Sequence, residues 1–399
     1  MIDTMFVGLS GLRTFQKGLS NIGNNVANLN TPGFKRTSLQ FTDMMYQYDA
    51  QGGESGQHGE GVKIGATLTD FSAGELQSST NPLDVAVDGG GFFVSKNGEQ
   101  TNYSRVGQFE LDADGALVSR QDKSRIQMFD PATGLTDFTI GALRSQMAKP
   151  TTTIKFADNL STGATSSSAE TTVYDKDGTQ RQLKISFTSN AATTPRSWKV
   201  EVQDKAAQST VGSGEIRFDP DGSPSFAYNQ LTMKLKSATG GESDLKLFFG
   251  QPGSISDTTS LSGGTSSTIR VASQDGYGAG ALTKLTFDGE GKGQISYSNG
   301  QSAVAGRLAL AWFSQPDHQL ERAGSGYYRA LAGQSPEYGA AGSGVFGKVA
   351  GGKLELSNVE LSSEFSDMMI TQRGYQAASQ LITAANEMMQ QALQMKGSR

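Results

Sequence analysis

The chain has 399 residues, no cysteine, 50 glycines and a net charge of −5 at neutral pH. This length predicts two or three compact units. The acidic balance argues against a nucleic-acid-binding surface, which requires clustered Lys and Arg, and the lack of cysteine excludes disulfides and thiolate metal sites. No apolar run approaches the roughly 18 residues of a membrane span, and the first residues lack the pattern of a cleavable secretory signal. We therefore expect neither nucleic-acid binding nor membrane insertion.

Residues 1–30 have the spacing of an amphipathic helix. Their apolar positions alternate three and four residues apart, as on one helix face, at Leu12, Phe15, Leu19, Ile22, Val26 and Leu29. The helix should stop in the segment from Asn28 to Gly33, because Pro32 lacks a backbone donor and Gly33 accepts a left-handed turn.

Residues 31–70 read as a polar connector. The part from Asp49 to Gly61 contains five glycines and no large apolar residue. We predict a loop or an extended arm here, with a mobile linker as the alternative.

The middle of the chain changes from helical periodicity to alternation, which predicts antiparallel strands. Residues 71–145 and 271–356 form the expected inner β domain, with a hairpin turn at Asn97-Gly98. Residues 146–270 form an expected outer β domain, inserted through two connectors rich in Ser and Gly. The predicted fold class is multidomain α plus mainly β, with a coiled-coil-like pair of terminal helices and two nested antiparallel β domains of barrel or sandwich type.

Residues 357–399 are predicted to be a long helix, capped by Ser357 with Glu360 three residues later. One row of side chains recurs every seven residues at Leu361, Met368, Tyr375, Ile382 and Met389. A companion row contains Phe365, Gln372, Ser379, Asn386 and Leu393. Two such rows form the seam of a helix that lies against other helices, so the two ends of the chain are expected to pair. Two ordinary helices packed on one globular core are the alternative.

Motifs that could carry chemistry are incomplete. The stretch from Gly342 to Lys348 fits two glycine-rich phosphate-binding patterns, but Val349 replaces the Ser or Thr that holds magnesium and Ala350-Gly351-Gly352 disfavours a following helix. The aspartates before Gly115, Gly178 and Gly222 suit tight turns better than calcium loops. The two histidines, His58 and His318, lack partners for a triad or a metal site. The sequence therefore predicts no enzyme, cofactor or metal.

Three segments resemble a known family: Ala27 to Arg36, Asp84 to Phe109, and Leu356 to Gln376. They are similar to the N-terminal, β-domain and C-terminal signatures of bacterial flagellar axial proteins, the rod and hook subunits. The N-terminal motif consists of Asn28, Thr31, Pro32, Gly33, Phe34 and Lys35. The glycine at position 374 departs from the family pattern, and because glycine weakens a helix by about 1 kcal/mol, local flexibility is expected there.

The resemblance implies a structural role. Rod subunits are shorter and lack a large inserted domain, so this chain is more similar to the hook subunits, which self-polymerise into a curved, flexible tube that transmits motor torque to the filament. Expected neighbours are the distal rod protein, the hook cap and the hook–filament junction proteins. The expected location is the extracellular hook, reached by type III export without a cleavable signal. The resemblance also implies that the two helical ends line the inner wall, so their apolar rows are the expected assembly residues. The alternatives are a distal rod or other axial protein, a secreted β-rich adhesin and, least supported, an enzyme.

Overall fold

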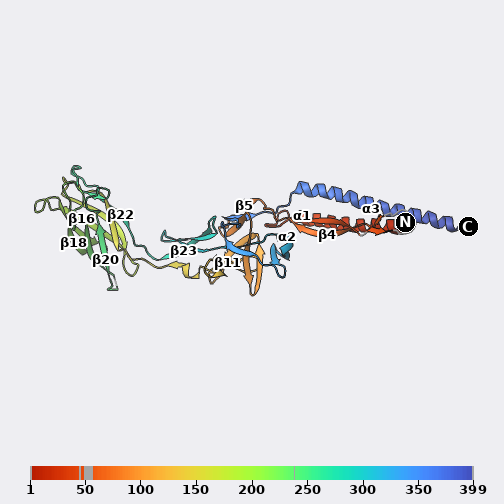
Figure 1. Ribbon diagram of the computed structural model, residues 1–399. Coiled ribbons are helices and arrows are strands. Elements are labelled where there is room, and N and C mark those ends of the chain that lie inside the picture. The colour runs from red at the N-terminus through yellow and green to blue at the C-terminus, as the bar shows by residue number, and fades with distance from the viewer. Residues whose placement is uncertain (1, 45, 49–56, 238, 398–399) are drawn as a thin grey trace. The chain divides into compact units, whose positions relative to one another are not determined.

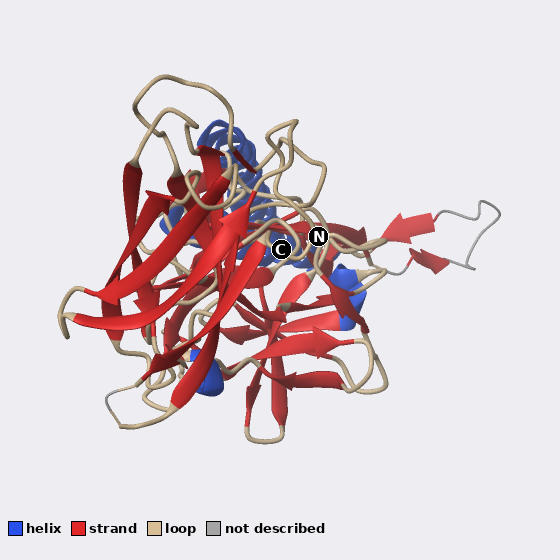
Figure 2. Ribbon diagram, turned by 90° about the vertical axis from the view of Figure 1, so that its left-hand side faces the viewer, coloured by secondary structure: helices blue, strands red, loops and turns tan. Residues whose placement is uncertain are grey.

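The computed structural model describes residues 2–44, 46–48, 57–237 and 239–397. Contacts between residues divide the chain into two units. Unit 1 consists of Met1–Gly141, Leu285–Ile295 and Val304–Arg399, and unit 2 consists of Ala142–Lys284 and Ser296–Ala303. Strands, red in Figure 2, account for most of the chain between the two long terminal helices, drawn in blue.

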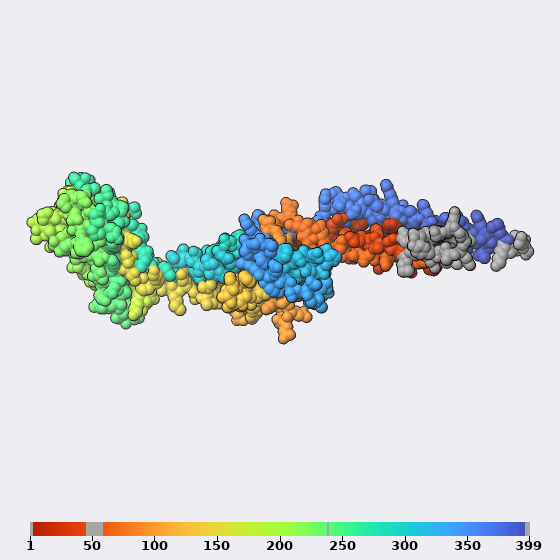
Figure 3. All heavy atoms as spheres, in the orientation of Figure 1, coloured from red at the N-terminus to blue at the C-terminus, as the bar shows by residue number. Residues whose placement is uncertain are grey.

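The two long helices of unit 1 run antiparallel (Figure 1), and their residues, red and blue, lie side by side (Figure 3). They are α1 (Ile2–Ala27) and α3 (Leu361–Gly397), and a third helix, α2 (Pro316–Gln319), is a single turn. α1 ends where the sequence predicts, and the Asn28 side-chain amide donates to the Asn24 carbonyl at 2.8 Å. The predicted cap of α3 is wrong. The Ser357 hydroxyl accepts from the Val359 amide, and the first carbonyl bonded within α3 belongs to Glu360.

The connector after α1 forms an arm of paired strands in unit 1. β1 (Thr37–Asp43) pairs antiparallel with β4 (Val62–Thr69), and β2 (Tyr46–Tyr48) pairs with β3 (Gln57–Gly59). Of the glycine-rich stretch predicted as a loop or arm, residues 49–56 lie outside the described residues. Of the described remainder, Gln57–Gly59 forms β3 and Gly61 adopts φ +107°.

The β part of unit 1 is built around one twelve-stranded sheet, in the order β27-β28-β8-β7-β11-β10-β9-β6-β30 with β12, β26 and β29 attached. The strands before the insertion are β5 (Leu76–Ser78), β6 (Asp84–Asp88), β7 (Phe92–Asn97), β8 (Gln100–Ser104), β9 (Val106–Leu111), β10 (Leu117–Ser119), β11 (Arg125–Asp130) and β12 (Gly134–Asp137). Those after it are β26 (Ala309–Trp312), β27 (Leu320–Gly324), β28 (Tyr327–Ala330), β29 (Glu337–Ala340), β30 (Lys348–Gly351) and β31 (Lys353–Glu355). The predicted turn at Asn97-Gly98 joins β7 to β8, with Gly98 at φ +62°.

Unit 2 contains two sheets around a core rich in aromatic residues. One sheet has the order β15-β16-β17-β18, and the other has β19-β20-β14-β21 with β22 attached. The Phe156 and Phe249 rings stack in the core with centroids 4.7 Å apart, and Trp198 is buried beside them. The strands are β14 (Thr153–Asn159), β15 (Ser166–Tyr174), β16 (Gln180–Ser189), β17 (Ser197–Asp204), β18 (Ser209–Arg217), β19 (Gln230–Lys236), β20 (Glu242–Phe248), β21 (Thr258–Thr259) and β22 (Arg270–Gln274).

The predicted fold class is confirmed, with one refinement: β14 pairs in parallel with β20 and β21. The short elements η1 (Gly141–Leu143) and β13 (Ser145–Gln146) begin the insertion, and the division between units falls within β23 (Gly280–Phe287), β24 (Lys292–Tyr297) and β25 (Ser302–Arg307). The Ser-rich stretches predicted as connectors belong to unit 2. Ser161 is buried there, and its hydroxyl donates to the Gly264 carbonyl. The division of unit 1 into terminal helices, arm and inner β domain stays a prediction.

Candidate functional site: the terminal helices and their junction

The two terminal helices approach closely because small residues line their contact. A Cβ atom added to Gly8 would lie 2.8 Å from Cγ1 of Ile382, and one added to Gly18 would lie 3.1 Å from Cγ2 of Thr371. The Phe15 ring covers Gly374, where an added Cβ would lie 2.6 Å from two ring carbons. Gly374 is therefore explained by packing, in place of the flexibility expected from the sequence.

The predicted assembly residues of α1 lie at or near this contact. Ile22 is buried, and the others are half-buried, namely Leu12, Phe15, Leu19, Val26 and Leu29. Leu29 lies in the turn after the helix.

The two predicted rows of α3 differ in their surroundings. In the first row Met368, Tyr375, Ile382 and Met389 are half-buried, whereas Leu361 is exposed. The companion row is exposed throughout, at Phe365, Gln372, Ser379, Asn386 and Leu393. The row that completes the contact with α1 consists of Glu364, Thr371, Ala378, Ala385 and Ala392, which are buried or half-buried. The companion row is thus not part of the pairing within the chain, and its role in assembly stays a prediction.

A second apolar face of α3 is exposed, and sequence reasoning missed it. It consists of Ile370, Ala377, Leu381, Ala384 and Met388, which we call the α3 stripe. Ile370 is 68% exposed, Leu381 39% and Met388 48%. At about 100° per residue these positions share one flank of the helix, on the side opposite the companion row. Its signal was present in the sequence, since Ile370, Ala377 and Ala384 are seven residues apart.

A groove of about 1540 Å³ runs along α1 beside the arm. One face of α1 between Asp3 and Lys17 forms one wall, and the arm contributes Met44, Gly59, Glu60, Val62, Lys63 and Ile64. The arm is fixed to α1 because the Ser10 hydroxyl accepts from the Val62 amide at 3.2 Å. The charged residues that line the groove are Asp3, Arg13, Lys17, Glu60 and Lys63, and its exposed large apolar residues are Phe6 and Leu9.

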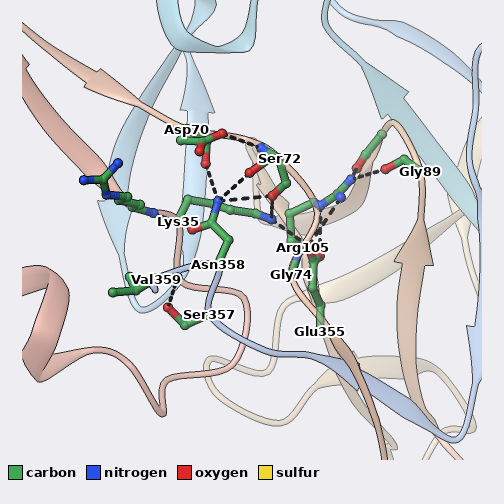
Figure 4. Close-up of polar contacts among 12 residues, drawn as sticks. Lys35, Asp70, Ser72, Gly74, Gly89, Arg105, Glu355, Ser357, Asn358 and Val359 are labelled. Atoms are coloured by element: carbon green, nitrogen blue, oxygen red, sulfur yellow. Dashed lines mark hydrogen bonds and ion pairs between the residues drawn. The ribbon is translucent and has the colours of Figure 1, made fainter. Parts of the chain in front are cut away.

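A buried ionic cluster joins the residues after α1 to the last strand, β31 (Figure 4). Lys35 and Glu355 are both fully buried, and the Lys35 ammonium donates to Oε1 of Glu355 at 2.6 Å and to the Ser72 carbonyl at 2.6 Å. The Arg105 guanidinium donates to Oε2 of Glu355 at 3.0 Å and to the Gly91 carbonyl at 2.6 Å. Burial lowers the pKa of Lys35, and the charge of Glu355 opposes this shift. One carboxylate therefore compensates two buried cations.

A second set of polar contacts fixes the start of α3. Asn358 accepts from the Arg36 amide at 2.7 Å, and its own amide donates to the Asp70 carbonyl at 2.9 Å. The Arg36 side chain binds Glu364 at 2.5 Å, which raises the pKa of Arg36. Glu364 also accepts from Asn25 of α1 at 3.2 Å. Glu364 of α3 thus receives charge-assisted hydrogen bonds both from α1 and from Arg36, the residue before β1, and such bonds are stronger than neutral ones.

The predicted family motif supplies part of this junction. Asn28 accepts from the Thr31 hydroxyl at 3.1 Å, and Gly33 adopts φ +68° against Val106, where a side chain would clash. The guanidinium of Arg322 lies over the Phe34 ring. Pro32 is half-buried in the turn, and Lys35 is the buried cation described above.

The residues that suggested chemistry in the sequence are a glycine-rich stretch and two histidines. The stretch from Gly342 to Lys348 links β29 to β30 and is not followed by a helix. His318 is exposed in α2, and the side chain of His58 lies outside the described residues. The described residues contain no group of acidic, His or Cys side chains arranged to hold a metal ion.

Four family models match successive parts of the chain. They are described as flagella basal body rod protein (residues 5–35), flagellar hook protein FlgE/F/G D1 domain (86–144), flagellar basal body protein FlaE D2 domain (142–277) and flagellar basal body rod FlgEFG protein C-terminal (350–395). The flagellar hook protein FlgE of Salmonella typhimurium is 31% identical over 96% of this chain and 97% of its own length. The chain belongs to the flagellar hook protein family.

Other hook proteins match over similar lengths. Those of Treponema pallidum and Borreliella burgdorferi are 30% and 28% identical, each over 99% of this chain and 100% of their own length. The crystal structure of Helicobacter pylori FlgE2 is 12% identical and covers 68% of this chain and 98% of its own, with a TM-score of 0.43. As a member of the hook protein family, the chain is a structural subunit of the flagellum. Within the described residues, none of its helices has the length and apolarity needed to cross a bilayer.

Proposed function

We propose that this hook subunit polymerises with copies of itself into a curved, flexible tube that transmits torque from the flagellar motor to the filament. In this proposal the terminal helices line the inner wall and the β domains form the outer layers. The distal rod protein, the hook cap and the hook–filament junction proteins are the proposed neighbours. The chain reaches its extracellular location unfolded, by type III export.

The observation that carries the self-assembly proposal is the exposed α3 stripe. Three large apolar side chains, Ile370, Leu381 and Met388, are each at least 39% exposed on one flank of a helix whose other flank already packs on α1. Contiguous apolar surface of this kind marks an interaction site on soluble proteins. A subunit contact that covers the stripe would remove it from water, at a gain of about 25 cal/mol for each Å² of apolar area.

The test uses the full chain in a salting-out buffer, with tubes counted by negative-stain electron microscopy. The wild-type chain is expected to form curved tubes of uniform width, whereas Leu381→Glu, which places a charge in the stripe, should form few or none. Gln376→Glu is the matched control, because it adds the same charge at an exposed position of α3 outside the stripe. Straight tubes would favour a rod-like role. Normal tubes from Leu381→Glu would contradict the assignment of the stripe to assembly.

A further inference from the structure

The sequence contains two Asn-Gly pairs, Asn97-Gly98 and Asn299-Gly300, and each lies in the turn region of a hairpin. An asparagine that precedes glycine can react with its own backbone, because glycine has no Cβ atom to hinder the approach of its amide nitrogen. The reaction needs two free groups, the asparagine side chain that is attacked and the glycine amide that attacks. The structure leaves both groups free at one pair and holds both at the other.

The pair at the tip of the β7–β8 hairpin is unrestrained. Asn97 is the exposed last residue of β7, and its side chain has no hydrogen-bond partner among the described residues. The Gly98 amide donates to no acceptor in the described part of the chain, and a Cβ atom added to Gly98 would meet nothing within 4 Å. Asn97 is paired only with Gln100, so fraying of this single residue pair is enough for the two reacting groups to approach each other.

The pair between β24 and β25 is held at both reacting groups. Asn299 is half-buried, and its side-chain amide donates to the Gly278 carbonyl at 2.9 Å and to Oε1 of Gln146 at 3.2 Å. Its Oδ1 atom accepts from the Gln301 amide at 3.0 Å. The Gly300 amide donates to the carbonyl three residues before it, at 3.1 Å. The side chain and the attacking nitrogen must therefore both break hydrogen bonds before they can react.

We infer that Asn97 is a site of spontaneous modification in the folded subunit, where it converts to aspartate and isoaspartate while Asn299 stays intact. The Gly98 nitrogen, after losing its proton to hydroxide, attacks Cγ of Asn97. The bond between Cγ and Nδ2 breaks, and ammonia leaves with a proton from water, so that hydroxide is regenerated and a five-membered cyclic imide remains. Water then opens the imide at one of its two carbonyl carbons. One water molecule is consumed and one ammonia is released, without oxidation or reduction.

The modification places a negative charge on the hairpin face where Arg329 lies. The Arg329 guanidinium donates to Oδ1 of Asn102 and to Oε1 of Gln100, both at 3.2 Å, and it forms no ion pair with a described residue. Gln100 stands directly opposite Asn97, and opposite residues of a hairpin project to the same face. Aspartate at position 97 thus faces a cation that lacks a carboxylate. A subunit of net charge −5 gains one further negative charge as it ages, whether or not it assembles.

The test incubates the folded full chain at mildly alkaline pH and follows both Asn-Gly peptides by mass spectrometry, with isoaspartate counted by enzymatic methylation. Asn97 should react roughly 100-fold faster than Asn299. This ratio corresponds to about 2.8 kcal/mol, the order expected for the two or three neutral hydrogen bonds that must break at Asn299. In the chain unfolded by guanidinium chloride, the two rates should become nearly equal. Equal rates in the folded chain, or an Asn97 that stays intact, would overturn the inference.

Two variants show whether the hydrogen bonds cause the difference. Gln146→Ala removes one hydrogen bond from Asn299 and should raise the rate at Asn299 about fivefold, the effect of one neutral hydrogen bond, with the rate at Asn97 unchanged. Asn97→Gln is the matched control for the reacting group. Its amide is retained, but the longer side chain would have to close a six-membered ring, so modification at position 97 should cease. An unchanged rate at Asn299 in Gln146→Ala would contradict the argument from restraint.

Discussion

Replacing Glu355 by glutamine should destabilise unit 1 far more than replacing its partner Lys35 by methionine. Glu355→Gln leaves the Lys35 ammonium and the Arg105 guanidinium buried without a counter-charge. Breaking a buried pair in this way costs about 3–5 kcal/mol. Lys35→Met removes a cation that burial already disfavours, as the lowered pKa of Lys35 indicates. In that variant Glu355 keeps Arg105 and the Gly74 amide as donors. The main loss is the hydrogen bond to the Ser72 carbonyl, which costs about 1–2 kcal/mol.

Urea unfolding followed by tryptophan fluorescence can measure this difference. Trp312 lies in unit 1 and Trp198 in unit 2. Placing every variant in a Trp198→Phe background therefore makes the signal report unit 1 alone. The expected result is a free energy of unfolding about 2 kcal/mol lower for Glu355→Gln than for Lys35→Met. Equal losses in the two variants, or a larger loss for Lys35→Met, would refute the idea that one carboxylate compensates two cations.

Two further predictions concern helix packing and pH. Gly374→Leu should lower the thermal stability of the α1–α3 pair, measured by circular dichroism at 222 nm, because the new side chain would clash with the Phe15 ring. Adding Phe15→Ala to the same chain should recover part of this loss. If stability does not recover, the contact between Gly374 and Phe15 is contradicted. Burial alone would raise the pKa of Asp204, but hydrogen bonds from the Arg181 guanidinium and neighbouring amides outweigh it and hold that pKa below its usual range. Ionised Asp204 therefore stabilises unit 2 above about pH 4, and this stability is lost as the pH falls through the lowered pKa. Between about pH 5 and 2.5, the urea midpoint of unfolding should fall less steeply with pH in Arg181→Leu than in the wild-type chain. If the midpoints of both chains fall equally steeply, the stabilising role of the Asp204–Arg181 pair is refuted.

Local features of the fold could be predicted from the sequence because local chemistry determines them. The stop of α1 follows from proline and glycine, and the turn at Asn97-Gly98 follows from the left-handed preference of glycine. These effects act over a few residues and need no knowledge of distant partners.

The residues through which α1 and α3 meet could not be predicted in the same way. Sequence reasoning assigned the seam to large side chains and polar companions such as Gln372, whereas the helices meet through Gly8, Gly18 and Ala385, which allow closer approach. Glycine weakens an isolated helix. Only the structure shows that the Phe15 ring occupies the space that a side chain at position 374 would need. The cluster at Glu355 was missed because its members are distant in sequence and no periodicity links them.

The closure of unit 1 by β31 sets an order of folding. Glu355 pairs with residues that precede it by 250 positions or more, and β30 completes the sheet by pairing with β6. Both Glu355 and β30 come later in the chain than every strand of unit 2 up to β22. Contacts so distant in sequence form late, because a long loop must close first. A chain truncated shortly after Ala303 should therefore refold into a complete unit 2 with an unfinished unit 1, and the residues after Ala303 would complete the subunit.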